Sequence, residues 1–332
     1  MAPGRAIVRR SAARPGLLAG TISVAPVGTR ERPDASLLIV LLAGTGCKST
    51  AGKEGSDEKA AQTESDKDKA KRTAAETVFY EECAKLGSTG GTVSGRDGWL
   101  FSAGELLQLS RISSTGTATG SIADYAQQLR SRGIDLIVVP VPPKSLVYPD
   151  KVSRAAKVPM KSRRPARLDS VLKAAMADLE SRNVKVVDLL PALIARRDDK
   201  AGTVFPRTSS TWSPTGIQVA VKEIADAVRD SKAGGRGSVT GITAEPVTIT
   251  FTGGLAIGEP NMKPESFQGT KIGRITGDKV RSLSFNASGG SVLLMGDSNI
   301  LAWREINNPQ GSNPAFCSLA EQLAAELQII PD

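Results

Sequence analysis

The stretch ADYAQQLRSRGIDLIVVPV (residues 123–141) predicts an α-helix that leads directly into a buried β-strand. Tyr125 and Leu129 recur on one helical face, and Gly133 follows them as a C-cap. The apolar run after Gly133 is continuous and rich in β-branched residues, which is typical of a strand buried on both faces of a parallel sheet. A Pro-rich loop, residues 142–150, leaves the carboxyl end of this strand.

The same alternation continues toward the C-terminus. We expect helices at residues 167–183, 213–231 and 318–328, and strands at residues 184–190, 246–251 and 291–298. Strands and helices that alternate at this spacing predict an α/β fold, a three-layer sandwich with a mainly parallel sheet. Functional sites in such sheets lie beyond the carboxyl ends of the strands, an edge that the 142–150 loop and residues 205–213 can both reach.

Composition excludes several classes of function. Aromatic residues make up only 4% of the 332 residues, so base-stacking platforms and a nucleic-acid partner are not expected. The chain has no histidine and no paired cysteine motif, so we predict no metal site and no cofactor. The net charge of +9 suits an acidic polysaccharide as partner, although ordinary solubility charge is the alternative.

Residues 1–47 have the features of an export leader. The apolar run SLLIVLLA (36–43) follows Arg30 and Arg32, is too short to span a bilayer, and precedes small residues and Cys47. This pattern predicts a signal peptide, with lipidation of Cys47 as in bacterial lipoproteins. The predicted location is the periplasm, free or anchored to the membrane through that lipid. The alternative is a buried strand or helix, which needs partners on both sides.

A charged linker separates this leader from the folded body. Residues 48–77 hold almost no large apolar side chains and cannot bury enough surface to offset chain entropy. The apolar pattern resumes at about Val78, so we expect the folded domain to span residues 78–332. Cys83 and Cys317 form a disulfide if the compartment is oxidising, or remain two free thiols.

SVLLMGDSNILAW (291–303) predicts a buried strand that runs into a sharp turn with Ser298 at its tip. Such a turn exposes a serine hydroxyl as a nucleophile, and the backbone around Gly296 and Ser298 can stabilise an oxyanion. A serine needs a base to lose its proton at neutral pH. No histidine is present to act as that base.

Five blocks of the chain resemble alginate O-acetylation proteins of the AlgJ/AlgX kind. The blocks occur in the family's order: GRDGWLFSAGEL (95–106), YAQQLRSRGIDLIVVPVPPKSLVYPD (125–150), KVVDLLPAL (185–193), TSSTWSPTG (208–216) and LLMGDSNI (293–300). The resemblance implies an SGNH-hydrolase-like fold that transfers acetyl groups to exopolysaccharide hydroxyls in the periplasm, through an acyl-serine at Ser298. It also implies that family members extend beyond residue 332, so that part of the domain is missing at the C-terminus.

The resemblance locates a degenerate catalytic pair. Ser209 stands at the family's aspartate position and Thr211 at its histidine position, while Trp212, Pro214 and Gly216 match the family block. Ser298 therefore keeps the nucleophile position without its base. Two functional interpretations follow. The first is acyl transfer through Ser298, and the second is a non-catalytic accessory pseudoenzyme that binds the polysaccharide or another protein of the acetylation machinery. A slow esterase and a decayed gene product are further alternatives.

Two residues are candidates for substrate binding or for a replacement base. Lys144 lies in the 142–150 loop and could bind substrate or act as base if burial lowers its pKa; a solvated loop charge is the alternative. Trp212 could contact sugar, or pack beside the site. The basic run 151–167 could hold a uronate-rich polymer, or be an ordinary solvated loop.

Overall fold

The computed structural model describes residues 36–43, 73–112, 117–231, 241–259, 261–276, 279–281, 283–285, 292–304 and 317–329. All of them belong to one compact unit, Pro33–Asp332. Its helices are α2 (Ala74–Gly87), α3 (Ala103–Ser110), α4 (Thr117–Arg130), α5 (Lys144–Val147), α6 (Pro149–Val152), α7 (Ser170–Ser181), α8 (Leu190–Arg196), α9 (Pro214–Arg229), α10 (Ser298–Leu301) and α11 (Leu319–Leu327), with 3-10 turns η1 (Arg96–Gly98) and η2 (Gly254–Ala256). None of the helices in this part of the chain is long and apolar enough to cross a membrane.

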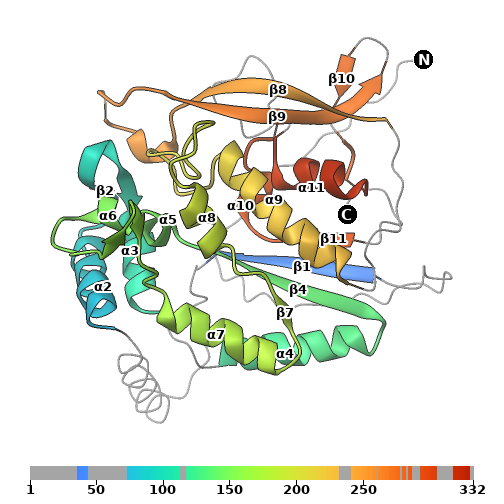
Figure 1. Cartoon of the computed structure of the whole chain (residues 1–332), viewed down its shortest axis with the longest axis horizontal. Helices are drawn as coiled ribbons and strands as arrows, with labels where there is room; N and C mark the ends of the chain where they lie inside the picture. Colours follow the sequence, from blue (N-terminus) through green and yellow to red (C-terminus); the bar gives the residue numbers. More distant parts are fainter. Residues whose placement is uncertain are drawn as a thin grey trace, which may run out of the picture. The chain divides into compact units, whose positions relative to one another are not determined.

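A four-stranded parallel sheet lies at the centre of the unit. Its order is β11 (Val292–Met295), β1 (Ser36–Ala43), β4 (Ile134–Val141) and β7 (Lys185–Val186), and every pairing is parallel. Helices α4 and α7 cover one face, and α9 lies on the other (Figure 1). The predicted α/β three-layer arrangement is therefore present.

Three smaller sheets are antiparallel, so the strands of the whole unit are mixed. The largest joins β8 (Ile242–Phe251), β9 (Glu265–Thr276) and β10 (Lys279–Arg281), and it packs against α9 and α11 (Figure 1). The other two are the hairpins β2 (Thr92–Ser94) with β3 (Leu100–Ser102) and β5 (Met160–Lys161) with β6 (Arg164–Pro165). The sequence indicated only the second half of β8.

The helix–strand unit predicted at residues 123–141 is present as α4 and β4. Helix α4 buries Leu129, and Gly133 follows it with a φ of 73°, a left-handed conformation that favours glycine. Strand β4 then buries Ile137 and Val139 completely. The aliphatic side chains of β4 thus anchor the centre of the core, and its carboxyl end delivers the chain to the 142–150 loop.

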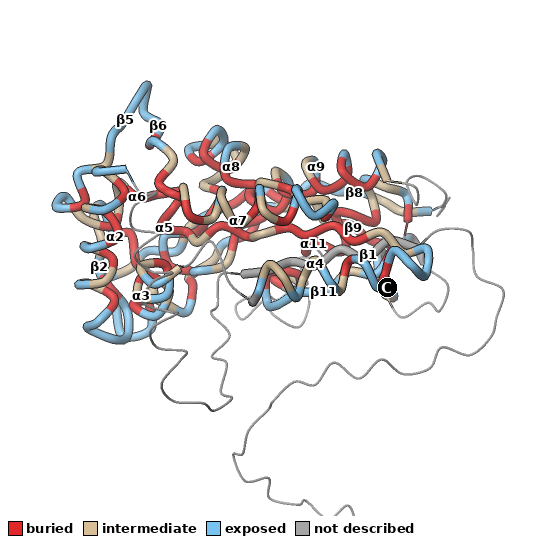
Figure 2. The backbone as a smooth tube through the Cα atoms, turned by 90° about the horizontal axis from the view of Figure 1, so that it is seen from below, coloured by how far each residue is buried: buried red, intermediate tan, exposed pale blue. Residues whose placement is uncertain are grey.

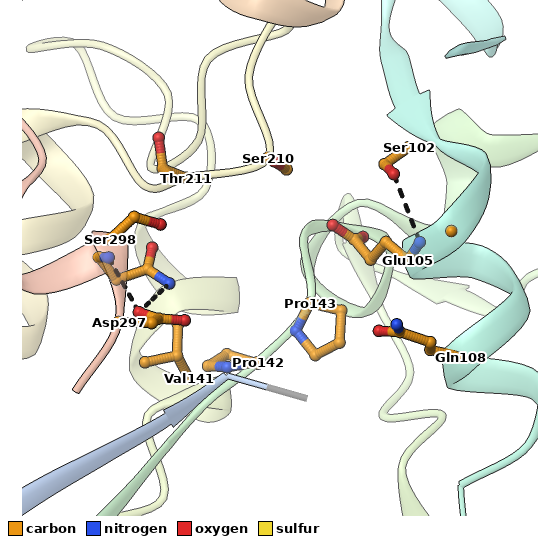
Figure 3. A pocket seen from close by; sticks show the side chains of 12 residues that line it. Ser102, Glu105, Gln108, Val141, Pro142, Pro143, Ser210, Thr211, Asp297 and Ser298 are labelled. Atoms are coloured by element: carbon orange, nitrogen blue, oxygen red, sulfur yellow. Dashed lines mark hydrogen bonds between the residues drawn. The ribbon is translucent and has the colours of Figure 1, made fainter. Parts of the chain in front are cut away.

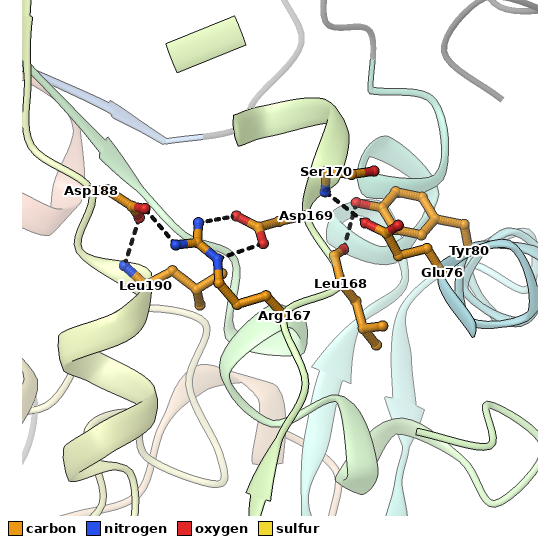
Figure 4. Close-up of polar contacts among 8 residues, drawn as sticks. All are labelled: Glu76, Tyr80, Arg167, Leu168, Asp169, Ser170, Asp188 and Leu190. Carbon is orange, nitrogen blue, oxygen red and sulfur yellow. Dashed lines mark hydrogen bonds and ion pairs between the residues drawn. The ribbon is translucent and has the colours of Figure 1, made fainter. Parts of the chain in front are cut away.

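Strand β7 is much shorter than the predicted strand 184–190. A polar cluster around Arg167 and Asp188 forms where the strand ends. The Arg167 guanidinium contacts Asp169 at 2.5 Å and Asp188 at 2.6 Å (Figure 4). A second oxygen of Asp188 accepts a hydrogen bond from Leu190 N at the start of α8. Asp188 therefore ends the strand and begins the next helix.

Helix α2, with Thr73 as its N-cap, begins before Val78, where the folded domain was predicted to start. Thr73 and Glu76 form a reciprocal capping box at the start of α2. Glu76 also accepts a hydrogen bond from Ser170 N at 2.6 Å, so the first turn of α2 is joined to α7 (Figure 4). Residues 73–77, assigned to the linker by composition, belong to the domain. Cys83 and Cys317 are both buried and are not bonded to each other, so the disulfide alternative does not hold in this structure.

Strand β1 occupies the segment that the sequence predicts as a signal-peptide core. It pairs with β4 along eight residues, from Ser36 opposite Ile134 to Ala43 opposite Val141, and with β11 along four. This is the alternative of a strand with partners on both sides. Cleavage before Cys47 would remove β1, so leader and strand exclude each other in one molecule. Cys47 itself lies outside the described residues.

The strand can be tested by introducing proline at its centre. Ile39→Pro removes a ladder hydrogen bond from a strand paired on both sides, so the free energy of unfolding should fall by about 2–4 kcal/mol. Urea unfolding of the full chain measures this change. Ser56→Pro, in the predicted linker, serves as control and should cost little. Equal stability of the two variants would contradict a structural β1 and favour the leader.

Candidate functional site

A cavity of about 290 Å³ opens where strands β4 and β11 end. Its wall combines residues 141–143 at the end of β4, Ser210 and Thr211 from the loop before α9, residues 297–299 at the start of α10, and part of the first turns of α3 (Figure 3). The structure therefore brings Thr211 and Ser298 to one cavity, although 87 positions separate them in the sequence.

Ser298 is exposed at the first position of the short helix α10. Asp297 precedes it as N-cap, and its carboxylate accepts hydrogen bonds from Asn299 N at 2.9 Å and Asn299 Nδ2 at 3.1 Å (Figure 3). Gly296 is exposed directly after the end of β11. The backbone N–H of Ser298 lies in the first turn of α10, where N–H groups have no acceptor within the helix. A strand, a turn and a helix form around Ser298, and its hydroxyl faces the cavity (Figure 3). The strand is shorter than predicted and is not buried throughout, since Leu293 and Met295 are exposed.

Ser209 and Thr211, in the loop before α9, hydrogen-bond to each other. Their hydroxyl oxygens lie 2.9 Å apart, and Thr211 N donates to Ser209 Oγ at 3.2 Å. Thr211 lines the cavity, whereas Ser209 is 8% exposed and lies behind it. The two hydroxyls thus keep the local contact expected between an orienting group and its partner. Neither hydroxyl accepts a proton readily at neutral pH.

Lys144 is buried and hydrogen-bonds to the backbone of the loop before α9, residues 206–209. Its ammonium donates to the carbonyl oxygens of Leu100 at 2.5 Å and Ser209 at 2.7 Å, with longer contacts to those of Arg207 at 3.2 Å and Pro206 at 3.4 Å. The side chain has no exposed surface. Both predicted roles, substrate contact and solvated loop charge, are therefore wrong for Lys144 in this structure.

The environment of Lys144 changes its charge equilibrium. Burial lowers its pKa from 10.5 to about 8, and the nearby carboxylates of Glu105 and Glu265 oppose this shift. A pKa of about 8 lies in the range that a lysine base requires. The hydrogens of the amine, however, point at backbone carbonyl oxygens. Geometry excludes it as the base for Ser298 in this arrangement.

Trp212 packs inside the protein and joins the loop to α10. It is fully buried; its indole N–H donates to Asn299 O at 2.9 Å, and Trp303 Nε1 donates to Trp212 O at 2.8 Å. The sugar-platform prediction for Trp212 is contradicted by this burial. Its contacts hold the turn that carries Ser298 against the loop that carries Thr211.

Glu105 is a cavity residue that the sequence analysis missed. Its carboxylate accepts hydrogen bonds from Ser145 N at 3.3 Å and Ser145 Oγ at 3.1 Å, on the cavity wall opposite Ser298 (Figure 3). Burial raises the pKa of Glu105, and the Lys144 ammonium lowers it in part. The pattern Ser102-x-x-Glu105 signals only a helix start, which hides this second role.

Replacing Lys144 should destabilise the protein. Lys144→Met keeps an apolar chain of similar length but leaves the buried carbonyls of Leu100 and Ser209 without their donor. The free energy of unfolding at about pH 7 should fall by about 3 kcal/mol in a urea titration. Lys85→Met, an exposed lysine on α2, is the control and should change little.

The lowered pKa of Lys144 gives this effect a pH dependence. Between about pH 8 and pH 10.5 the unfolded chain holds more protons at this residue than the native protein does, so its contribution to stability rises with pH. The slope limit is about 1.4 kcal/mol per pH unit. The difference in unfolding free energy between wild type and Lys144→Met should therefore widen from about pH 8 to pH 10. A constant difference would refute the lowered pKa.

Comparisons with known proteins support the fold and the family. Residues 92–304 match the family model "SGNH hydrolase-like domain, acetyltransferase AlgX". The curated "Probable alginate O-acetylase AlgJ" of Pseudomonas aeruginosa is 28% identical over 156 residues, 47% of this chain and 36% of that protein. Its namesake in Pseudomonas putida is 29% identical over 204 residues, 57% of this chain and 50% of that protein.

The structural comparison supports the fold alone. A solved structure of Pseudomonas aeruginosa AlgX superposes with a TM-score of 0.50 at 15% identity, covering 72% of this chain and 52% of that one. The chain spans half or less of the length of the two curated relatives. The family model covers residues 92–304, more than half of the chain, and so confirms the resemblance found in the five sequence blocks. The chain belongs to the SGNH hydrolase-like, AlgX-type acetyltransferase domain family.

Proposed function

We propose that this protein acts in the O-acetylation of an acidic exopolysaccharide as a binding member of the machinery, with acyl transfer through Ser298 strongly impaired. The observation that supports this proposal is the hydrogen-bonded hydroxyl pair of Ser209 and Thr211, of which Thr211 lines the same cavity as Ser298. The resemblance implies that these two positions match the family's aspartate and histidine. The two curated relatives are each named "Probable alginate O-acetylase AlgJ", and this name supplies the polysaccharide class.

The missing base sets the expected size of the impairment. Acyl transfer would require Ser298 Oγ to lose a proton as it attacks an acetyl ester, and a neutral hydroxyl such as Thr211 cannot hold that proton. Loss of a triad member typically costs about 10⁴–10⁶ in turnover, while oxyanion and binding contributions keep about 10³–10⁴ over water. The backbone at Gly296 and Ser298 would supply such residual catalysis.

Slow acyl transfer is the second candidate function, and Glu105 favours it. Its carboxylate lines the same cavity as Ser298, and burial raises its pKa toward the range useful for a general base. Glu105 lies across the cavity from Ser298, which suits proton transfer from an incoming acceptor hydroxyl or water better than activation of the serine. Residual turnover that disappears in Glu105→Gln would support this candidate.

The proposed location is the periplasm, reached through the leader predicted in residues 1–47. Lipidation of Cys47 would anchor the protein to a membrane facing that compartment. Strand β1 opposes this part of the proposal, because a processed protein would lack it. Cell fractionation with mass determination of the N-terminus distinguishes a processed chain from one that retains residues 36–43.

Restoring the base pair tests the proposed site directly. The double substitution Ser209→Asp and Thr211→His places a carboxylate and an imidazole at the hydrogen-bonded positions beside Ser298. Hydrolysis of p-nitrophenyl acetate should rise by about 10²-fold or more over wild type. Mass spectrometry should show one acetyl group on Ser298 under acidic quench.

Three controls define the result. Each single substitution should gain little, and Ser298→Ala in the double variant should abolish both turnover and adduct. A double variant that unfolds at the wild-type temperature but gains no activity would refute an esterase-type cavity. A wild-type protein as active as the double variant would refute the impaired role, and Glu105→Gln would then identify its base.

A further inference from the structure

We propose that a second cleft, between the β5–β6 hairpin and the end of α8, binds the carboxylate groups of an acidic polysaccharide. The cleft has a volume of about 540 Å³ and lies outside the Ser298 cavity, with which it shares no lining residue. This inference rests on the proposed function for the polymer class only. Its evidence is the charge and geometry of the cleft itself.

Cations dominate the lining. The hairpin contributes Arg163 and Arg164, and the end of α8 with the following turn contributes Arg196, Arg197 and Lys200. Two acids, Asp198 and Asp199, lie among them. Figure 2 shows the hairpin tip exposed, so its charges are accessible to a large ligand.

The two acids neutralise only part of this charge. Asp199 pairs with Arg196 at 2.6 Å, and the buried Arg197 is held by Asp150 at 2.7 Å and approached by Asp198 at 3.5 Å. In the part of the chain that the structure describes, no carboxylate pairs with the three remaining cations, Arg163, Arg164 and Lys200. Arg164 makes one long contact, 3.5 Å to Ala195 O. The cleft therefore keeps a positive charge toward solvent.

The hairpin turn supports a binding role for Arg163. Ser162 and Arg163 have φ values of 49° and 64°, the left-handed conformation in which two-residue hairpin turns favour asparagine and glycine. An arginine there is unfavourable for the backbone, yet it projects a long cationic side chain at the cleft rim. Strain of this kind, at a site with unpaired charge, is typical of functional positions.

The ligand must carry several anionic groups. Exposed ion pairs are individually weak and are screened by salt, so a single carboxylate would bind poorly to this open cleft. A polymer with a carboxylate on each sugar gains from multiple contacts, because the first contact raises the effective concentration of the next. A polyuronate matches this requirement and the class of the proposed substrate.

The test measures binding of oligouronates to the full chain by isothermal titration calorimetry. Wild type should bind at low ionic strength and lose most of its affinity when salt is raised to about 0.15 M. Arg163→Gly should weaken binding about threefold or more, while its melting temperature stays equal or rises because glycine suits the left-handed turn. A structural role alone would instead lower the melting temperature and leave affinity unchanged.

Matched controls separate this cleft from general charge effects and from the Ser298 cavity. Arg132→Gln removes an exposed cation beyond α4 and should leave affinity unchanged; equal weakening by Arg132→Gln and Arg163→Gly would overturn the proposal, as would no binding by wild type. Neutral dextran should not bind. Esterase gain in the base-restored protein together with failed oligouronate binding would overturn the cleft but not the proposed function.

Discussion

The arrangement of the Ser298 cavity depends on one buried ammonium group. Lys144 stands at the start of α5, directly after the end of β4, and donates to carbonyl oxygens on β3 and on the loop before α9. A buried charge without partners would be strongly unfavourable, so these carbonyls and the ammonium fix one another. The constraint acts through backbone atoms. It therefore positions residues 206–209 whatever side chains they carry.

The loop that carries Thr211 is anchored independently of the Ser209 and Thr211 side chains. The Ser209 carbonyl is held by Lys144 and the Trp212 indole is held by Asn299, so neither anchor involves the side-chain oxygens of Ser209 or Thr211. The attachment of the loop therefore does not require a particular side chain at positions 209 and 211. Scaffold and chemistry are thus separable here, which makes a family fold with a weakened site physically consistent.

Sequence patterns predicted the parts of this protein that depend on periodicity. Apolar spacing predicted the α4–β4 unit and helices α7, α9 and α11. The five family blocks predicted that Ser298 and Thr211 line one cavity. The role of Lys144 could not be predicted, because its partners are carbonyl oxygens that every residue possesses. Glu105 was hidden for a related reason: its contact with Ser145 crosses from α3 to α5. The short β7 depends on Arg167 and Asp188, an ion pair set by tertiary structure.

Strand β1 could not be predicted from the sequence for a different reason. A strand inside a parallel sheet and the core of a signal peptide have the same sequence pattern. Eight consecutive small or aliphatic residues satisfy a parallel strand and a signal-peptide core equally well. In the folded chain β1 lies between β4 and β11, and β11 carries the turn that presents Ser298. Removing β1 would leave β11 without its sheet partner in the described structure. The segment that the leader prediction would remove is therefore the strand that joins β11, and with it the turn that carries Ser298, to β4.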